Sequence, residues 1–152
     1  MEMNLILAYV GVLIMTGVSF AASVLGCTIC GNTVIGAMKK NPDAFGSYVA
    51  LSALPSSQGL YGFVGYFMVQ SHLVPGISLL KACVILILGI LLAFANFYSG
   101  YRQTQVCANG IKETGDGHNV FAVTMVLAVF PELYAILALL VTILVSGALG
   151  TI

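Results

Sequence analysis

The sequence predicts an all-α membrane protein with four transmembrane helices, arranged as two duplicated helical hairpins. The first observation is composition: of 152 residues, 60% are hydrophobic and 7% are charged, with a mean hydropathy of +1.07. A soluble domain carries about a quarter charged residues, so this chain cannot cover its surface with polar groups in water. The second observation is a set of four apolar runs, each near or above the roughly 20 residues that span a bilayer as a helix. The third is a similarity between the two halves of the chain.

The four expected helices follow one another with a polar turn after each of the first three. They cover Leu5–Leu25, Tyr48–Val69, Leu79–Phe97 and Val120–Leu149. The turns read KKNPDAFG, SHLVPG and KETGDGHN, and their prolines, glycines and asparagines are helix-ending residues. Glu2 stands where a signal peptide would carry basic residues, so we expect a retained first helix.

The basic residues are unevenly distributed over the three turns. Lys39, Lys40, Arg102 and Lys112 lie in or beside the first and third turns, and only Lys81 lies near the second. The positive-inside rule then places the first and third turns in the cytoplasm and both termini on the opposite side. We expect a multi-pass protein of a prokaryotic cell membrane. The net charge of zero leaves no basic face for nucleic acid.

The two halves of the chain align with each other. Gly26 matches Gly100 at an offset of 74 residues, and the dipeptide LY at residues 60–61 recurs at residues 133–134, at an offset of 73. One deletion in the loop accounts for the change of offset, and the repeat predicts two units of the same orientation. The units are a first hairpin, residues 1–73, and a second hairpin, residues 74–152.

Small residues recur at helical spacing in the first and third expected helices. Gly17 and Ala21 are four residues apart, as are Gly89 and Ala93, and such pairs let helix backbones approach closely. Spacing alone favours packing within one bundle over crowding around the axis of an oligomer.

A single charged residue, Glu132, lies inside the otherwise uncharged run from Val120 to Leu149. A charge at the centre of a membrane helix costs about 3 kcal/mol on insertion scales, so an intramembrane carboxylate indicates a function. Under the repeat alignment Glu132 falls opposite Gly59, so only the second hairpin carries the carboxylate. Pro131 precedes it and removes one helical N–H donor.

The second expected helix supplies oxygen groups at a similar level. Its candidates occupy positions i, i+3, i+4 and i+7, and therefore one helical face: Leu54, Ser57, Gln58 and Tyr61. Pro55 frees a main-chain carbonyl there, and Gln103, at the end of the third expected helix, adds an amide. Such groups can simply hold helices together by hydrogen bonds. Together with a carboxylate, they favour a site for a small hard cation.

Other chemistry is weakly indicated. Cys27 and Cys30 form a CxxC pair, but no second CxxC pair or histidine accompanies it, so we expect neither a redox centre nor a zinc site. We expect no organic cofactor and no catalysis by this chain alone.

Three segments carry a resemblance to a known family. The segments LPSSQGLYGF (residues 54–63), YSGYRQTQV (98–106) and PELYAIL (131–137) resemble the membrane-ring proteolipid, subunit K or c, of V-type and A-type rotary ATPases. The resemblance spans essentially the whole chain and is strongest to sodium-transporting members. It implies a ring of identical subunits that moves ions across the membrane, coupled to ATP hydrolysis in a separate soluble head.

The resemblance also implies roles for individual residues. Glu132 matches the ion-carrying carboxylate, and Tyr61 matches a residue that closes the site by a hydrogen bond to it. The sodium ligands match Leu54 (main-chain carbonyl), Ser57, Gln58, Gln103 and Glu132. Ser57 stands where sodium-transporting relatives often have threonine, which keeps the hydroxyl.

Partners follow from the same resemblance. The ring contacts lipid and a membrane stator protein that presents a basic residue to Glu132. A central-stalk protein docks on the cytoplasmic turns, Lys39–Phe45 and Lys112–Asn119.

Two alternatives remain at the level of sequence. The number of oxygens favours Na+ over H+ as the carried ion, although a proton carrier could keep them as a hydrogen-bond network. A small four-helix proton-coupled exchanger is less favoured, because the chain lacks tryptophan and its carboxylate lies in the last helix.

Overall fold

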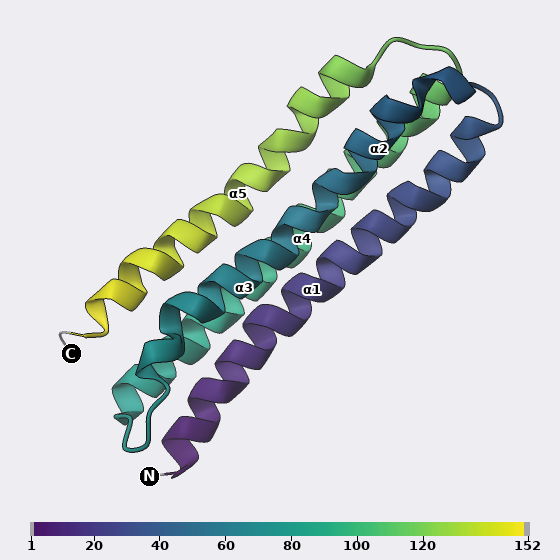
Figure 1. Ribbon diagram of the computed structural model, residues 1–152. Coiled ribbons are helices and arrows are strands. Elements are labelled where there is room, and N and C mark those ends of the chain that lie inside the picture. Colours follow the sequence, from purple (N-terminus) through teal and green to yellow (C-terminus); the bar gives the residue numbers. More distant parts are fainter. Residues whose placement is uncertain (1, 151–152) are drawn as a thin grey trace.

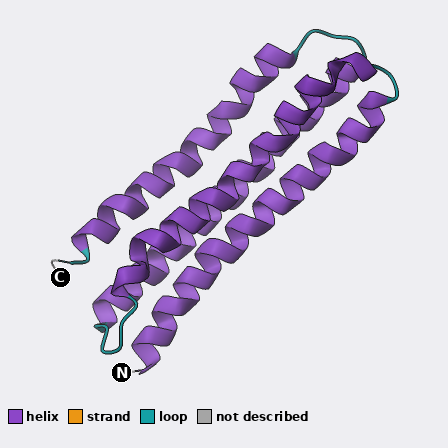
Figure 2. Cartoon of the chain, viewed as in Figure 1, coloured by secondary structure: helices purple, strands orange, loops and turns teal. Residues whose placement is uncertain are grey.

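The computed structural model describes residues 2–150, and every element in that range is helical (Figures 1 and 2). Three short 3-10 turns, at Pro42–Ala44, Leu54–Ser56 and Gln70–His72, join or interrupt the α-helices. The α-helices are α1 (Glu2–Met38), α2 (Phe45–Ala53), α3 (Ser57–Val69), α4 (Leu79–Gly115) and α5 (Phe121–Ala148).

The helices form an elongated bundle in which α2 and α3 together make one rod beside α1, α4 and α5 (Figure 1). The α1–α2 and α4–α5 turns lie at one end, and both termini and the α3–α4 loop lie at the other. We call these the turn end and the terminus end. The most extensive helix pairing is between α1 and α4, which come from different halves of the chain.

Among residues 2–150, three helices are long and apolar enough to cross a membrane, namely Met3–Met38, Leu79–Gly115 and Phe121–Ala148. The fourth expected span is helical over most of its length, but Pro55 interrupts it and leaves α2 and α3 with 9 and 13 residues. Across this break the Ser57 N–H bonds to the Leu54 carbonyl, three residues back instead of four. By contrast, α5 continues through Pro131 without ending.

Two of the expected helix ends are wrong. Both α1 and α4 have 37 residues, about 55 Å of helix, and run well beyond Leu25 and Phe97. The added segments contain no proline and reach the turn end, where α4 stops just before Gly117 at φ +94°. The expected turn Lys112–Asn119 is therefore shorter, because its first four residues form the last turn of α4.

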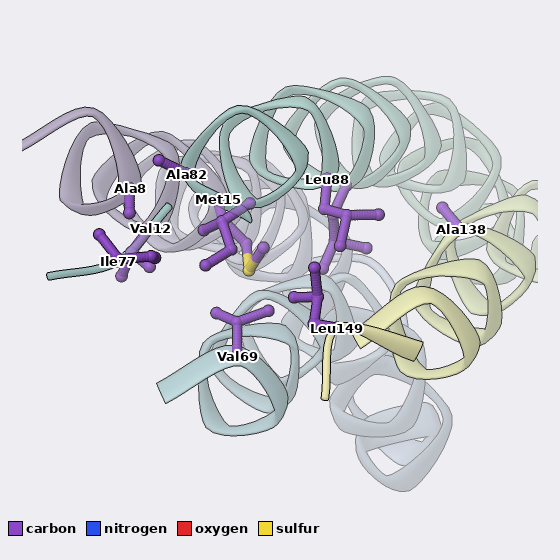
Figure 3. Packing of buried hydrophobic residues seen from close by; sticks show 11 residues of the cluster. Ala8, Val12, Met15, Val69, Ile77, Ala82, Leu88, Ala138 and Leu149 are labelled. Carbon is purple, nitrogen blue, oxygen red and sulfur yellow. The ribbon is translucent and has the colours of Figure 1, made fainter. Parts of the chain in front are cut away.

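Apolar side chains form two cores along the bundle. Figure 3 shows the cluster toward the terminus end. Residues of α1, α3, α4 and α5 contribute to it, and so does Leu149, which follows α5. The second cluster lies toward the turn end and includes the fully buried Tyr48, Leu51 and Ile111. Both cores bring together residues from the two halves of the chain, so the halves fold against each other.

The small-residue prediction is confirmed for one pair only. A Cβ added to Gly89 would lie 2.7 Å from the carbonyl carbon of Gly11 and closer still to its oxygen, so these glycines set the α1–α4 approach. Gly17, in contrast, has no atom within 4 Å of such a Cβ. Gly17 and Ala21 are both exposed, so this pair sets no close helix approach among residues 2–150.

Candidate ion-binding site

Glu132 lies on α5, facing α3 and α4, and both of its carboxylate oxygens accept hydrogen bonds. The Tyr61 hydroxyl on α3 donates to Oε1 over 2.7 Å, and Gln103 Nε2 on α4 donates to Oε2 over 2.9 Å. Glu132 is half-buried, and these two donors fix the position of its side chain between α3 and α4. The two donors were both expected to lie near Glu132, and the structure brings them together with it.

Gln103 and Gln58, both fully buried, extend this network across the bundle. Gln103 Nε2 also donates to the main-chain oxygen of Ala128 over 3.1 Å, which fixes the amide against α5. Gln103 Oε1 accepts from Gln58 Nε2 over 2.9 Å, and the same nitrogen donates to Ser99 Oγ over 3.3 Å. The chain of bonds therefore runs from Gln58 through Gln103 to Glu132.

Ser57 and Leu54 lie at the break in the α2–α3 rod, where Ser57 Oγ donates to the Leu54 carbonyl oxygen over 3.2 Å. Ser57 is also in hydrogen-bonding contact with the Tyr61 side chain, which donates to Glu132, so the break borders the groups around the carboxylate. Pro55 is buried, and its ring packs where a Cβ on Gly26 of α1 would stand, so α1 holds the break in place. The break thus leaves a hydroxyl and a main-chain carbonyl on the segment that precedes Gln58.

Gln103 is not at the end of its helix as expected. Because α4 continues to Gly115, Gln103 lies about 18 Å from that end and directly opposite Glu132. Arg102 beside it points out of the bundle, donating to Tyr98 Oη over 3.0 Å and to Gln105 Oε1 over 3.1 Å. The guanidinium therefore takes no part in the hydrogen bonds around Glu132.

The groups near Glu132 are oxygen-rich. They comprise one carboxylate, two amides, a phenol and a serine hydroxyl, and small hard cations take oxygens of these kinds as ligands. Within residues 2–150 no three His, Cys, Asp or Glu side chains cluster, and Cys27 and Cys30 are free thiols.

Sequence reasoning missed Ser99 and the Ala128 carbonyl. Ser99 precedes Gln103 by four residues on α4, so its spacing places it on the same face. No sequence signal identifies a particular main-chain oxygen such as that of Ala128. It also missed Asn96, a buried amide one turn farther from Gln103, which bonds to Ser19 on α1.

A second polar cluster joins the α1–α2 and α4–α5 turns. Lys40 Nζ lies 2.6 Å from Asp116 Oδ1, Asn41 Nδ2 donates to the Thr114 carbonyl over 3.1 Å, and Tyr48 Oη donates to the Asn41 carbonyl over 3.0 Å. The hydrogen bond from Lys40 lowers the pKa of Asp116 below its usual range, and the same bond raises the pKa of Lys40.

Comparison with known proteins identifies the family. The chain matches the family of the ATP synthase C subunit twice, at residues 10–69 and 86–145. The chain belongs to this ATP synthase C-subunit family. It is 30% identical over 122 residues to the V-type sodium ATPase subunit K of Enterococcus hirae, a match covering 80% of this chain and 78% of that protein. It is 29% identical over 140 residues to the A-type ATP synthase subunit K of Methanocaldococcus jannaschii, covering 92% of this chain and 61% of that protein.

Membership of this family confirms the resemblance seen in the sequence. As a proteolipid of the V- and A-type kind, the chain is a non-catalytic membrane component of a rotary ATPase. The exchanger alternative is not supported, because the family match covers both halves of the chain.

Proposed function

We propose that this chain is the ion-translocating rotor-ring subunit of a V/A-type rotary ATPase and carries Na+ on Glu132. The observation that carries the proposal is the convergence of Tyr61, Gln103 and, through Gln103, Gln58 on the carboxylate. Leu54 and Ser57 complete the ligand set as a main-chain and a hydroxyl oxygen. The named relative from Enterococcus hirae is a sodium ATPase subunit, which supports the choice of ion.

The proposed cycle follows from electrostatics. A bare carboxylate facing lipid is too costly, so Glu132 travels through the membrane neutralised by its cation and closed by Tyr61. At the stator, a basic residue of the stator protein competes for the carboxylate and releases the ion. Hydrolysis of ATP in the soluble head supplies the torque.

The proposed architecture has four membrane spans, because the α2–α3 rod lies alongside three helices that are long enough to cross. The two family matches, one in each half, support a duplicated hairpin with units at residues 1–73 and 74–152. In a ring of identical subunits, the exposed Gly17–Ala21 face of α1 offers room for a neighbouring helix.

We place the turn end in the cytoplasm and the termini on the opposite side of a prokaryotic cell membrane. The basic residues at the turn end support this orientation, and both termini share the other end (Figure 1). A central-stalk protein then docks on Lys39–Phe45 and on the turn after α4.

The alternative cargo is a proton. A proton needs the carboxylate and one hydrogen-bond partner, which Tyr61 or Gln103 already supplies. The specific feature favouring Na+ is the second amide, Gln58, which does not touch the carboxylate and whose Oε1 is buried without a hydrogen-bond donor among residues 2–150. A cation uses such an oxygen, whereas a proton does not.

Labelling with a membrane-soluble carbodiimide tests the proposal, because the reagent modifies a protonated buried carboxyl. Modification of Glu132 is followed over a range of pH, with and without sodium. We expect protection by millimolar Na+ and none by K+. Labelling that depends on pH and ignores Na+ would make the protein a proton carrier.

A further inference from the structure

Two buried side-chain oxygens have no hydrogen-bond donor among residues 2–150: Gln58 Oε1 and Asn96 Oδ1. Both residues are fully buried. A buried acceptor without a donor loses its hydration and gains no hydrogen bond in return. Two such oxygens in one bundle therefore require an explanation. The site described above uses Gln58 but gives Asn96 no role.

The two oxygens border the same strip of α4. A Cβ added to Gly100 would lie 3.4 Å from both Oε1 and Cδ of Gln58, so the Gln58 amide rests directly on Gly100. Asn96 precedes Gly100 by four residues and therefore lies on the same face, one turn away. No side chain on Gly100 stands between them.

A hydrogen bond to α1 fixes the orientation of the Asn96 amide. Its Nδ2 donates to Ser19 Oγ over 2.8 Å, and that hydroxyl donates in turn to the Met15 carbonyl over 2.6 Å. The hydroxyl proton of Ser19 is used in the bond to Met15, so Ser19 can only accept a hydrogen bond from Asn96. This bond keeps Nδ2 of Asn96 pointing toward α1. The oxygen of Asn96 is therefore held away from Ser19 and has no hydrogen-bond donor within the described part of the chain.

The Gln58 amide, in contrast, has two usable orientations. In the structure its nitrogen donates to Gln103 Oε1 and Ser99 Oγ. Turning the amide over brings Gln58 Oε1 against Gln103 Oε1, and two facing amide oxygens repel unless a cation lies between them. The Ser99 hydroxyl can donate to or accept from either orientation. The same rotation of the amide places Gln58 Nε2 at the present position of Gln58 Oε1, against the face of α4 that carries Gly100 and Asn96.

We propose that Asn96 is a positioning residue for the sodium-bound state: its Oδ1 accepts a hydrogen bond from Gln58 Nε2, directly or through one water, when the Gln58 oxygen turns onto the cation. The inference rests on the proposed function of Glu132 as a sodium carrier. It links ion loading to the reversal of one buried amide, and it makes Asn96 a determinant of Na+ binding that proton binding does not need.

The test replaces Asn96 by Leu, which has the same number of side-chain heavy atoms and removes both the acceptor oxygen and the donor to Ser19. The control is Thr104→Val, which removes a buried hydroxyl on α4 that donates to the Gly100 carbonyl of the same helix. The readouts are the Na+ concentration that half-protects Glu132 from carbodiimide, 22Na+ binding, and the pH profile of labelling without Na+. We expect Asn96→Leu to raise the half-protecting concentration about tenfold, from the loss of one buried hydrogen bond. The pH profile stays unchanged, and Thr104→Val matches the unmodified protein in every readout.

A double-mutant cycle isolates the link to Gln58. In a Gln58→Met background, Asn96→Leu causes no further loss of 22Na+ binding if the two residues act together. An equal loss in both backgrounds would overturn the inference, and so would unaltered Na+ protection in Asn96→Leu.

The failure of this inference differs from failure of the proposed function. If the unmodified protein shows no Na+ protection at all, the sodium proposal is wrong and the role of Asn96 falls with it. If Na+ protects the unmodified protein and Asn96→Leu equally, only the role of Asn96 is wrong. Should Asn96→Leu not assemble, Ser19→Ala releases the Asn96 amide, and we expect a smaller loss of Na+ binding with an unchanged pH profile.

Discussion

The close approach of α1 and α4 predicts that Gly89→Ala destabilises the protein. A Cβ at Gly89 would lie 2.7 Å from the carbonyl carbon and 2.9 Å from the Cα of Gly11. Carbon atoms normally pack at about 3.5–4.0 Å, so the two helices must separate by roughly 1 Å at this level. Overpacking of this kind costs about 1–3 kcal/mol. Replacing glycine by alanine in a helix returns up to about 1 kcal/mol, which leaves a net loss of roughly 1 kcal/mol.

The matched control is Gly36→Ala on α1, where an added Cβ meets no atom within 4 Å. This substitution gains helix propensity without a clash, so the protein should be unchanged or up to about 1 kcal/mol more stable. Helicity is followed by circular dichroism as SDS is titrated into the protein in mild detergent. We expect the unfolding midpoint to fall for Gly89→Ala and to hold or rise for Gly36→Ala. Equal midpoints for the two variants would refute the account of α1–α4 packing.

Three further predictions concern the site and the turns. Glu132→Gln should abolish 22Na+ transport by vesicles that carry the assembled complex while the protein still assembles, and transport at the normal rate would contradict the proposed mechanism. Tyr61→Phe removes the donor to Oε1 and should weaken 22Na+ binding about tenfold, as expected for one hydrogen bond to a charged group, whereas Tyr66→Phe on the same helix should not. Lys40→Met should speed hydrogen exchange at the Asp116 amide. The lowered pKa of Asp116 stabilises the fold only above that pKa, and the raised pKa of Lys40 only below its own. The effect should therefore be present at about pH 7 and be lost as the pH falls through the lowered pKa of Asp116. An effect whose size does not change as the pH is lowered would exclude the ion pair as its cause.

Composition and periodicity were sufficient to predict a helical membrane protein, and the family match confirms the resemblance read from the residues near Glu132. The helix ends were the weakest part of the prediction. Apolar runs report where lipid or core begins and not where a helix stops, so the polar extensions of α1 and α4 went unrecognised. Pro55 signalled a break, but whether that break would end a helix depends on what packs against it, here Gly26 of α1.

The candidate site could likewise be predicted only in part from the sequence. Helical spacing placed Gln58 and Tyr61 on one face, and the structure brings both into the hydrogen-bond network of Glu132. Spacing along one helix cannot show which groups of another helix will meet them. The contribution of Ser99 and the unpaired oxygen of Asn96 therefore became evident only with α1, α3 and α4 in place.

The bonds between the two turns have a mechanical consequence. The Lys40–Asp116 pair is exposed and screened by salt, but the Asn41–Thr114 hydrogen bond is partly buried and largely insensitive to ionic strength. A force applied to either turn is therefore transmitted to both hairpins, instead of bending one loop against the other. The two turns therefore move together as one rigid unit. High salt should weaken the Lys40–Asp116 ion pair, while the Asn41–Thr114 hydrogen bond still connects the turns.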